Sequence, residues 1–243
     1  MRGKRTTRLI VLLAVSSLFT TSLLIVVQAT KRTPELNLRK PFSASSSVKA
    51  PHQANYSRLP LRFEANLGQA DSTVRFLTPT GGYQVSLFPT EASFSLNASS
   101  ETVRMVMSNA NPNPQIKGCD ELPGKTNYLI GSDPAKWRIG VPSYAKVRYA
   151  DVYPGVDLIY YGNQRRLEYD FVIAPGANPN WIKLTFTGAQ HLSINDEGDL
   201  VLRTDHGAIR QLKPVVYQET NGTKQYVTGH YKLTPTNEVA FKI

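Results

Sequence analysis

From Leu59 onward, apolar and polar residues alternate with a period of two over short segments of the chain. Residues 83–88 (YQVSLF), 91–96 (EASFSL) and 102–108 (TVRMVMS) show the pattern, and Gly, Pro and Asn punctuate them. Short alternating runs separated by turn residues are typical of half-buried β-strands. We therefore predict an all-β domain over residues 59–243, built as an antiparallel β-sandwich or as stacked sheets.

Turn signals between these segments predict where the chain reverses. Residues 195–199 (NDEGD) separate HLSI from LVLRT, and residues 220–223 (TNGT) carry Asn-Gly, the strongest short hairpin signal. Pro154-Gly155 predicts a further tight turn, with Gly155 at the position where φ is positive. We expect the chain to reverse at each of these places.

One long segment, residues 109–144, departs from the alternation. It holds five prolines and four glycines, so we predict a mostly irregular excursion from the sheets. Within it, DPAKW predicts a short helical turn, because Asp133 can cap it and Pro134 fits its first position. We expect Trp137 to pack the excursion onto the sheet.

Residues 152–177 (VYPGVDLIYYGNQRRLEYDFVIAPGA) predict a β-hairpin with one apolar and one polar face. With a turn centred on Asn163-Gln164, Asp157 lies opposite Asp170, and the period of two divides the side chains between the faces. The predicted apolar face consists of Val156, Leu158, Tyr160, Leu167, Tyr169 and Phe171. The predicted polar face consists of Asp157, Ile159, Tyr161, Arg166, Glu168 and Asp170.

The polar face of this hairpin raises the question of what neutralises its acids. Directly opposed like charges cost about 0.2–1 kcal/mol in a sheet, so Asp157 and Asp170 need a cation beside them. The first interpretation is Arg165, Arg166 or an arginine of a neighbouring strand, and the second is a Ca²⁺ site at Asp157 and Asp170. A ligand groove is a further interpretation, with the candidate binding residues Asp157, Tyr161, Glu168 and Asp170.

The N-terminus carries the pattern of an export signal. MRGKRTTR is basic, residues 9–27 are an apolar run broken by Ser and Thr, and Val27 and Ala29 offer small residues for cleavage. We predict residues 1–29 to be a signal peptide or a retained N-terminal anchor, followed by a flexible linker over residues 30–58. This places the domain outside the cytoplasm, secreted or in the cell envelope, with membrane contact only through residues 9–27 if uncleaved.

The charge, cysteine and histidine content of the chain limits the kinds of binding site that it can form. The net charge is +10, but four positive residues precede position 9, and without them 24 Lys and Arg face 18 Asp and Glu. The remaining positive residues are scattered, which argues against nucleic-acid binding. Cys119 is the one cysteine, so neither an intrachain disulfide nor a site with several thiolates is possible. No histidine lies in a metal-ligand spacing, and we predict no cofactor.

Four segments carry a family resemblance. They are residues 61–71 (LRFEANLGQAD), 82–96 (GYQVSLFPTEASFSL), 122–179 (LPGKTNYLIGSDPAKWRIGVPSYAKVRYADVYPGVDLIYYGNQRRLEYDFVIAPGANP) and 213–219 (KPVVYQE). Together they resemble the N-terminal domain of bacterial SBBP-repeat proteins, which are named for a seven-bladed β-propeller repeat. The resemblance runs from about Leu59 to Ile243 and implies an all-β domain between a signal peptide and propeller repeats. It implies no established activity and no catalytic residues.

The sequence departs from that pattern at VAFKI, where propeller repeats would follow, so we expect a fragment of a propeller protein or a stand-alone module. The function we expect is that of an exported, non-catalytic β-domain for cell-surface or extracellular interaction and assembly. Its partner would be a protein or a glycan. One alternative is a carbohydrate-binding module, suggested by the tyrosines and the acidic face. Another is a glycoside hydrolase-like enzyme that uses Asp157, Glu168 and Asp170.

Overall fold

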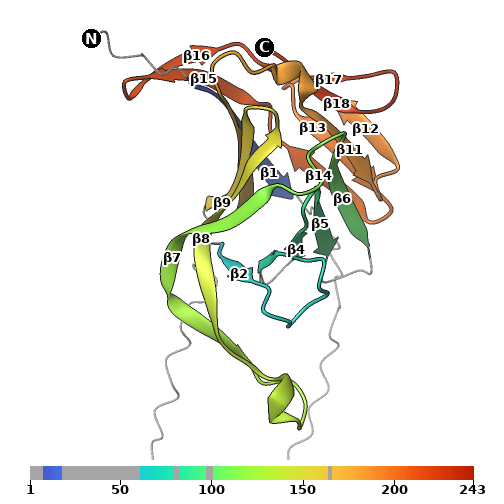
Figure 1. Ribbon diagram of the computed structural model, residues 1–243. Helices are drawn as coiled ribbons and strands as arrows, with labels where there is room; N and C mark the ends of the chain where they lie inside the picture. Colours follow the sequence, from blue (N-terminus) through green and yellow to red (C-terminus); the bar gives the residue numbers. More distant parts are fainter. Residues whose placement is uncertain (1–7, 18–60, 79–82, 97–100, 164–165) are drawn as a thin grey trace, which may run out of the picture.

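The computed structural model describes residues 8–17, 61–78, 83–96, 101–163 and 166–243 (Figure 1). Within these ranges the regular elements are β-strands, apart from the 3-10 turns η2 (Pro134–Lys136) and η3 (Pro179–Trp181). The predicted all-β class is confirmed. The first strands are β1 (Arg8–Ser17), β2 (Phe63–Ala65), β3 (Phe76–Thr78), β4 (Tyr83–Leu87), β5 (Glu91–Leu96) and β6 (Thr102–Met107).

Two long hairpins occupy the middle of the chain, and short strands follow them. The hairpin strands are β7 (Gln115–Tyr128), β8 (Arg138–Tyr153), β9 (Val156–Asn163) and β10 (Arg166–Ile173). The later strands are β11 (Lys183–Thr187), β12 (His191–Ile194), β13 (Leu200–Thr204), β14 (Gly207–Gln211), β15 (Val215–Thr220), β16 (Thr223–Val227), β17 (His230–Leu233) and β18 (Val239–Lys242).

The described strands form two antiparallel sheets. Pairing in the larger one runs β16–β15–β1–β10–β9–β8–β2–β3–β4–β5–β6–β11–β18–β17, with β7 along β8. The smaller sheet is β12–β13–β14, and β14 pairs with the end of β1. Phe94 and Val103 of the larger sheet face Leu202 and Ile209 of the smaller one across a narrow gap. The apolar core therefore lies between two sheets, as in a β-sandwich.

An aromatic row runs through this core. Edge-on or tilted ring contacts link Tyr149, Tyr160, Tyr169, Phe171 and Phe241, with centroids 5.5–6.0 Å apart. Burying such large side chains is the main favourable term in folding. The row passes from β8 through β9 and β10 to β18, so it joins the long hairpins to the C-terminal strands.

The hairpin β9–β10 confirms the predicted faces and corrects the predicted register. All six residues of the predicted apolar face are buried. Asn163, which we expected in the turn, instead pairs with Arg166, and every pair is shifted by two residues. Asp157 therefore lies opposite Val172, and Asp170 lies opposite Ile159. A shift of two preserves the faces because side chains alternate with that period, but it separates the two aspartates.

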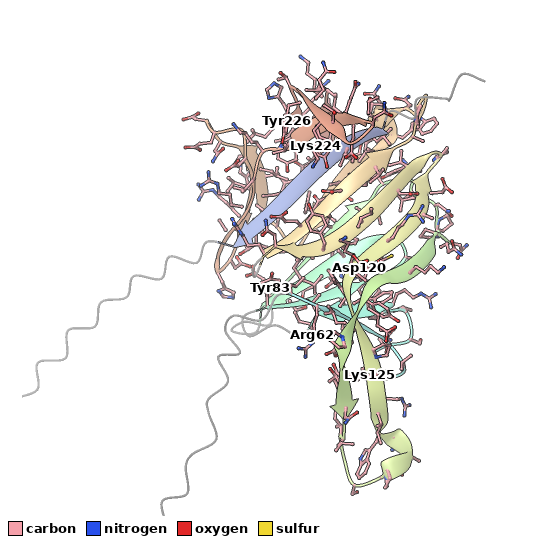
Figure 2. The ribbon with its side chains drawn as sticks, turned by 90° about the vertical axis from the view of Figure 1, so that its left-hand side faces the viewer. Arg62, Tyr83, Asp120, Lys125, Lys224 and Tyr226 are labelled. Carbon is pink, nitrogen blue, oxygen red and sulfur yellow. The ribbon has the colours of Figure 1, made fainter. Side chains whose placement is uncertain are left out.

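The predicted excursion at residues 109–144 is mostly strand rather than irregular. Strands β7 and β8 pair along a twisted hairpin whose outer part projects from the body, with η2 at its tip (Figures 1 and 2). We call residues 122–141 the arm. Pro123 and Gly124 fall in the register shift between Leu122 and Lys125, and Gly140 falls in the shift between the pairs Thr126–Val141 and Tyr128–Arg138. Proline is tolerated at such bulges because no ladder hydrogen bond is needed there.

The tip of the arm confirms one prediction and corrects another. The Asp133 side chain accepts from the Ala135 N–H and Pro134 opens η2, as DPAKW predicts. Trp137 does not pack the arm onto the sheet. Its indole Nε1 donates to the Gly131 carbonyl at 3.1 Å, within the tip itself.

The root of the arm is held by a buried carboxylate. Glu64 of β2 is fully buried and accepts hydrogen bonds from the Thr126 and Tyr128 hydroxyls of β7. Arg62 also reaches Glu64, with Nε 3.2 Å from the carboxylate oxygen. A buried charge satisfied in this way fixes the arm to the body by polar contacts.

The predicted turns are present. Asn195 and Asp199 close the β12–β13 turn through backbone hydrogen bonds. Asn221 and Gly222 both have positive φ, 52° and 77°, between β15 and β16. Gly155 also has positive φ, 71°, in the turn between β8 and β9. Each turn thus takes the backbone conformation that its residue types favour.

The N-terminal predictions lie largely outside the described residues, which exclude 1–7 and 18–60. The predicted linker, residues 30–58, lies entirely within the range 18–60, outside the described residues. Within the predicted signal or anchor, Arg8–Ser17 forms β1. In the ranges that the structure covers, no helix is long and apolar enough to cross a membrane. A signal peptide or anchor at residues 1–29 stays a prediction.

Candidate functional site

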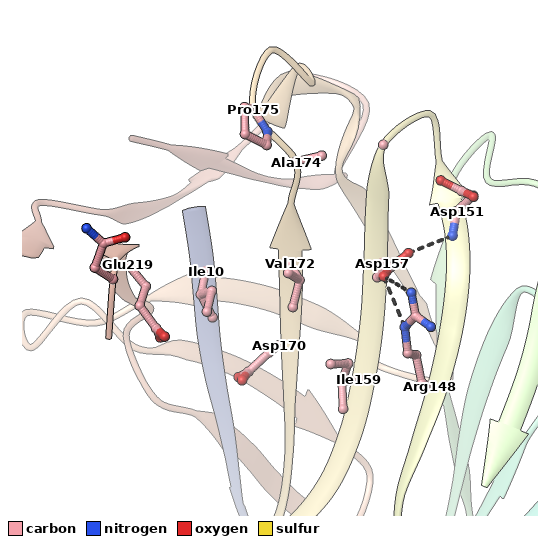
Figure 3. Close-up of a pocket in the computed structure, with 12 residues that line it drawn as sticks. Ile10, Arg148, Asp151, Asp157, Ile159, Asp170, Val172, Ala174, Pro175 and Glu219 are labelled. Atoms are coloured by element: carbon pink, nitrogen blue, oxygen red, sulfur yellow. Dashed lines mark hydrogen bonds and ion pairs between the residues drawn. The ribbon is translucent and has the colours of Figure 1, made fainter. Parts of the chain in front are cut away.

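Five neighbouring strands, β8, β9, β10, β1 and β15, turn one face away from the core and form an open concavity of about 1020 Å³ (Figure 3). We call it the acidic concavity. Its described lining residues are Ile10, Arg148, Asp151, Gly155, Asp157, Ile159, Asp170, Val172, Ala174, Pro175, Glu219 and Asn221. Four of these are carboxylates and one is basic. Side chains alternate between the two faces of a strand. The same strands therefore contribute apolar side chains to the core on one face and these charged side chains to the concavity on the other.

Asp157 on β9 is held by the adjacent strand β8. The Arg148 guanidinium donates to its Oδ2, with Nη2 at 2.6 Å and Nε at 3.1 Å. Asp157 Oδ1 accepts from the Asp151 N–H at 2.9 Å. Asp151 has φ of 51° where the β8–β9 register is interrupted, so the bulge directs its N–H to the carboxylate. The hydrogen bond with Asp157 also raises the pKa of Arg148, and it is the largest contribution to that increase.

Asp170 on β10 lies in a different environment. Its Oδ1 accepts from the Tyr161 hydroxyl at 3.0 Å. Burial raises the pKa of the Asp170 carboxyl to about 6, against the lowering effect of the Tyr161 hydrogen bond, and the nearby Glu168 charge adds to the increase. Burial, followed by the charge of Asp170, raises the pKa of Tyr161. Desolvation is thus the largest influence on the pKa of Asp170.

Glu168 is covered although it belongs to the outward face. It is 5% exposed and its Oε1 accepts from the Asn163 side-chain amide at 2.9 Å. Tyr161 lies directly opposite it on β9. A ligand in the acidic concavity would meet Asp157 and Asp170, which line it, before Glu168.

The structure divides the four predicted binding residues into two groups. Tyr161, Glu168 and Asp170 cluster around one cross-strand position, and Asp157 lies farther along the hairpin beside Arg148. The cation beside Asp157 is Arg148 of β8, and an arginine of a neighbouring strand was one of the predicted alternatives. The opposed aspartates that suggested a Ca²⁺ site are not opposed.

Other residues of the acidic concavity were missed. The Pro154-Gly155 turn predicts a hairpin of β8 with β9, and the alternation of AKVRYADVY would have placed Arg148 outward. Glu219 and Ile10 had no such signal. They reach the site through pairings of β1 with distant strands, which no local pattern specifies.

The acidic concavity can attract a positive group, since it gathers four carboxylates and one guanidinium in a chain of net charge +10. Carboxylates at a concave surface focus a negative field that overall charge does not cancel. Among the residues described, no group of three or more His, Cys, Asp or Glu could hold a metal ion. No catalytic constellation is evident in the same part of the chain.

Comparison with known proteins places most of this site inside a recognised domain. A family model described as "Domain of unknown function (DUF7948)" matches residues 63–243. The match contains every lining residue of the acidic concavity except Ile10, because β1 precedes it. No curated protein and no solved structure matches the chain.

Proposed function

Because the chain belongs to the DUF7948 family, whose function is unknown, we propose that it is an exported, non-catalytic interaction domain whose acidic concavity binds a basic segment of a protein partner. The observation that carries the proposal is the set of carboxylates around one open concavity. Their local field opposes the net charge of the chain and therefore favours a positively charged partner segment at this surface.

Export rests on the sequence of the first 29 residues. A basic start, an apolar run and small residues at Val27 and Ala29 support secretion or attachment to the cell envelope. The resemblance to SBBP-repeat proteins supports the same location, with this domain as an N-terminal module. The partner would then be met at the cell surface or outside the cell.

The geometry favours binding over hydrolysis. Asp157 is engaged by Arg148 and by a backbone N–H, so it lacks the free carboxylate of a glycosidase nucleophile or base. The raised pKa of Asp170 would suit a proton donor, but burial in structural networks raises carboxyl pKa values as well. Turnover of a glycan by the exported chain that is lost in Asp170→Asn would favour the enzyme.

Binding of a carbohydrate is the second candidate. Tyr161 is half-buried, and its hydroxyl is fixed on Asp170, an arrangement that could present one ring edge and a carboxylate to a sugar. A glycan-array signal that disappears in Tyr161→Ala and persists at high salt would favour this candidate over a basic protein segment.

An oligolysine peptide tests the proposal directly. We expect it to bind the exported chain more weakly as salt increases, because counterions screen the carboxylates. Replacing Asp157 and Asp170 together by Asn should weaken binding by about tenfold or more, equivalent to about 1.4 kcal/mol. The matched control replaces Asp196 by Asn and Glu197 by Gln, two exposed acids of the β12–β13 turn. Equal losses in both variants would contradict a specific site.

A further inference from the structure

Strand β1 lies inside the larger sheet although it comes from the N-terminal end of the described chain. Leu9–Ala14 pairs with β10, Arg8–Leu12 pairs with β15, and both pairings are antiparallel. Strands β10 and β15 therefore run parallel to each other with β1 between them. Figure 3 shows this order across the acidic concavity, with Ile10 between Val172 of β10 and Glu219 of β15.

No other described strand takes over these pairings. Strand β15 pairs only with β1 and β16, and the smaller sheet pairs with the larger one only where β14 meets Val15–Ser17, within the ranges that the structure covers. Removing β1 would leave unpaired backbone on β10, β15 and β14 at once. Unpaired edges of this kind are templates for a further strand.

The position that β1 occupies between β10 and β15 lies against the apolar core. Val11 is fully buried, and its neighbours in register are Phe171 on β10 and Val216 on β15, both buried. An empty position would expose these side chains to water. Burial of one such side chain is worth roughly 1.5–3 kcal/mol, so a replacement strand would be strongly favoured.

Two observations indicate that β1 is not the permanent occupant. It lies within residues 1–29, which carry the pattern of a cleaved export signal. It also precedes the recognised domain, which begins at residue 63 and yet contains both flanking strands, β10 and β15. The domain thus provides a strand position whose present occupant comes from outside it.

We propose that the slot between β10 and β15 is a strand-acceptor site, which binds an extended segment of a partner polypeptide after residues 1–29 are removed. This rests on the export part of the proposed function. The segment adds antiparallel to β10, and its main chain completes the ladders on both sides, as in other β-strand additions.

The surroundings of the slot define the side chains that the segment carries. At the position of Val11 it presents an apolar residue to the core. At the position of Ile10 it faces the acidic concavity, with Asp170 and Glu219 on the flanking strands. Arg8 lies opposite Glu219 in register, so a basic residue fits the N-terminal end of the segment. The partner segment is therefore extended, apolar on one face and neutral or basic on the other.

The test starts from the full chain made in an exporting host. Mass spectrometry of the recovered protein gives its N-terminus and so tests export and cleavage by itself. The recovered protein is then titrated with a synthetic peptide of residues 8–17, and the melting temperature and amide hydrogen exchange of β10 and β15 are followed. We expect the peptide to bind, to raise the melting temperature and to slow exchange in both strands.

A matched pair of peptides separates strand addition from unspecific adhesion. The Val11→Lys peptide places a charge in the core and should bind at least about tenfold more weakly, since the Val burial is lost and the Lys is unpaired. The Ile10→Lys peptide adds the same charge toward Asp170 and Glu219 and should bind as tightly as the parent peptide or more tightly.

Three results would overturn the inference. One is a cleaved chain that the peptide neither stabilises nor protects, which would leave export intact. Another is equal binding of the two lysine peptides. The third is an uncleaved chain in which β1 exchanges as slowly as β10 or is swapped between two copies in a dimer, because the slot is then never open to a partner.

Discussion

The hairpin β9–β10 and the arm are both antiparallel ladders within the larger sheet, but they are stabilised in different ways. One face of β9–β10 is sealed by the core, with the six apolar side chains at 0–1% exposure. The arm carries Ile130 and Ile139 at 69% exposure, and none of the described strands packs as a layer against its outer part. Backbone pairing is common to both, so what distinguishes them is a second layer that removes one face from water.

The arm is maintained by local polar contacts instead. Asn127 accepts from the Gly140 N–H across the ladder, and Trp137 bonds within the tip. At the root, Glu64 collects the β7 hydroxyls. We therefore expect substitutions in β9–β10 to lower the free energy of unfolding much more than substitutions in the arm.

Truncating a core side chain should give the largest difference. Phe171→Ala removes a fully buried ring from the aromatic row and should lower the free energy of unfolding by about 3–5 kcal/mol. Ile139→Ala in the arm should change it by less than about 0.5 kcal/mol. Urea denaturation of both variants checks this, and similar losses would show that the arm is packed in solution.

Adding a methyl group should give the next largest effect. A Cβ at Gly162 would lie 2.6 Å from Leu61 Cβ and 2.9 Å from the Leu61 carbonyl oxygen. Gly162→Ala should therefore destabilise by about 1–3 kcal/mol. A Cβ at Gly124 in the arm would meet nothing within 4 Å, and Gly124→Ala should be near neutral. Thermal melting of the two variants separates two causes. A clash with Leu61 would affect Gly162→Ala alone, whereas the loss of glycine flexibility would affect both variants.

The charge at Asp170 should give a pH-dependent effect of intermediate size. Its pKa is about 6 in the folded chain against 3.8 for the reference group. The folded state therefore holds more proton between these values, and the free energy of unfolding falls as pH rises from about 4 to about 6. Above pH 6 the cost of the buried charge is fully present. Asp170→Asn should thus stabilise by about 1–2 kcal/mol at pH 7 and lose that advantage below pH 4.

The control for this pH effect is Asp196→Asn, at an exposed turn position. It should leave the slope of stability against pH unchanged. A parent chain whose stability rises steadily between pH 4 and pH 6, with the same slope in Asp170→Asn, would contradict the buried carboxyl.

The surface ion pairs should give the smallest effects. Arg148–Asp157 in the acidic concavity has side chains 49% and 22% exposed, and Lys146–Asp120 near the arm root has 49% and 61%. Double-mutant cycles with alanine should give couplings of about 0.5–1 kcal/mol for the first pair and near zero for the second. Equal couplings would mean that the two hydrogen bonds that Arg148 donates to Asp157 stabilise no more than the single contact of Lys146 with Asp120.

The sequence predicts faces better than registers. Alternation in VDLIYYG and RLEYDFVIA assigned six apolar residues of β9–β10 correctly to the buried face, because a period of two tolerates a shift of two, but it placed the buried Glu168 on the outward face. It could not reveal that Asn163 pairs with Arg166 instead of forming the turn. The distance between Asp157 and Asp170 depends on that one detail, and so does the chemistry of the site.

The arm and β1 were mispredicted or missed for different reasons. Proline and glycine favour irregular structure locally, but the long ladder between β7 and β8 continues past Pro123, Gly124 and Gly140 through two register shifts. An apolar run such as residues 9–17 does not distinguish a strand from a membrane-targeting segment by periodicity. Its place between β10 and β15 is set by tertiary pairing alone.

The central claim is that the acidic concavity on the outward face of β9–β10, and not the arm, is the binding surface. Calorimetric titration of the exported chain with oligolysine tests it in two variants, one with Asp157→Asn and Asp170→Asn, the other with Ile130→Ser and Ile139→Ser at the arm. We predict binding about tenfold weaker or worse in the first variant and unchanged in the second. Loss of binding in the arm variant with retention in the concavity variant would contradict the claim.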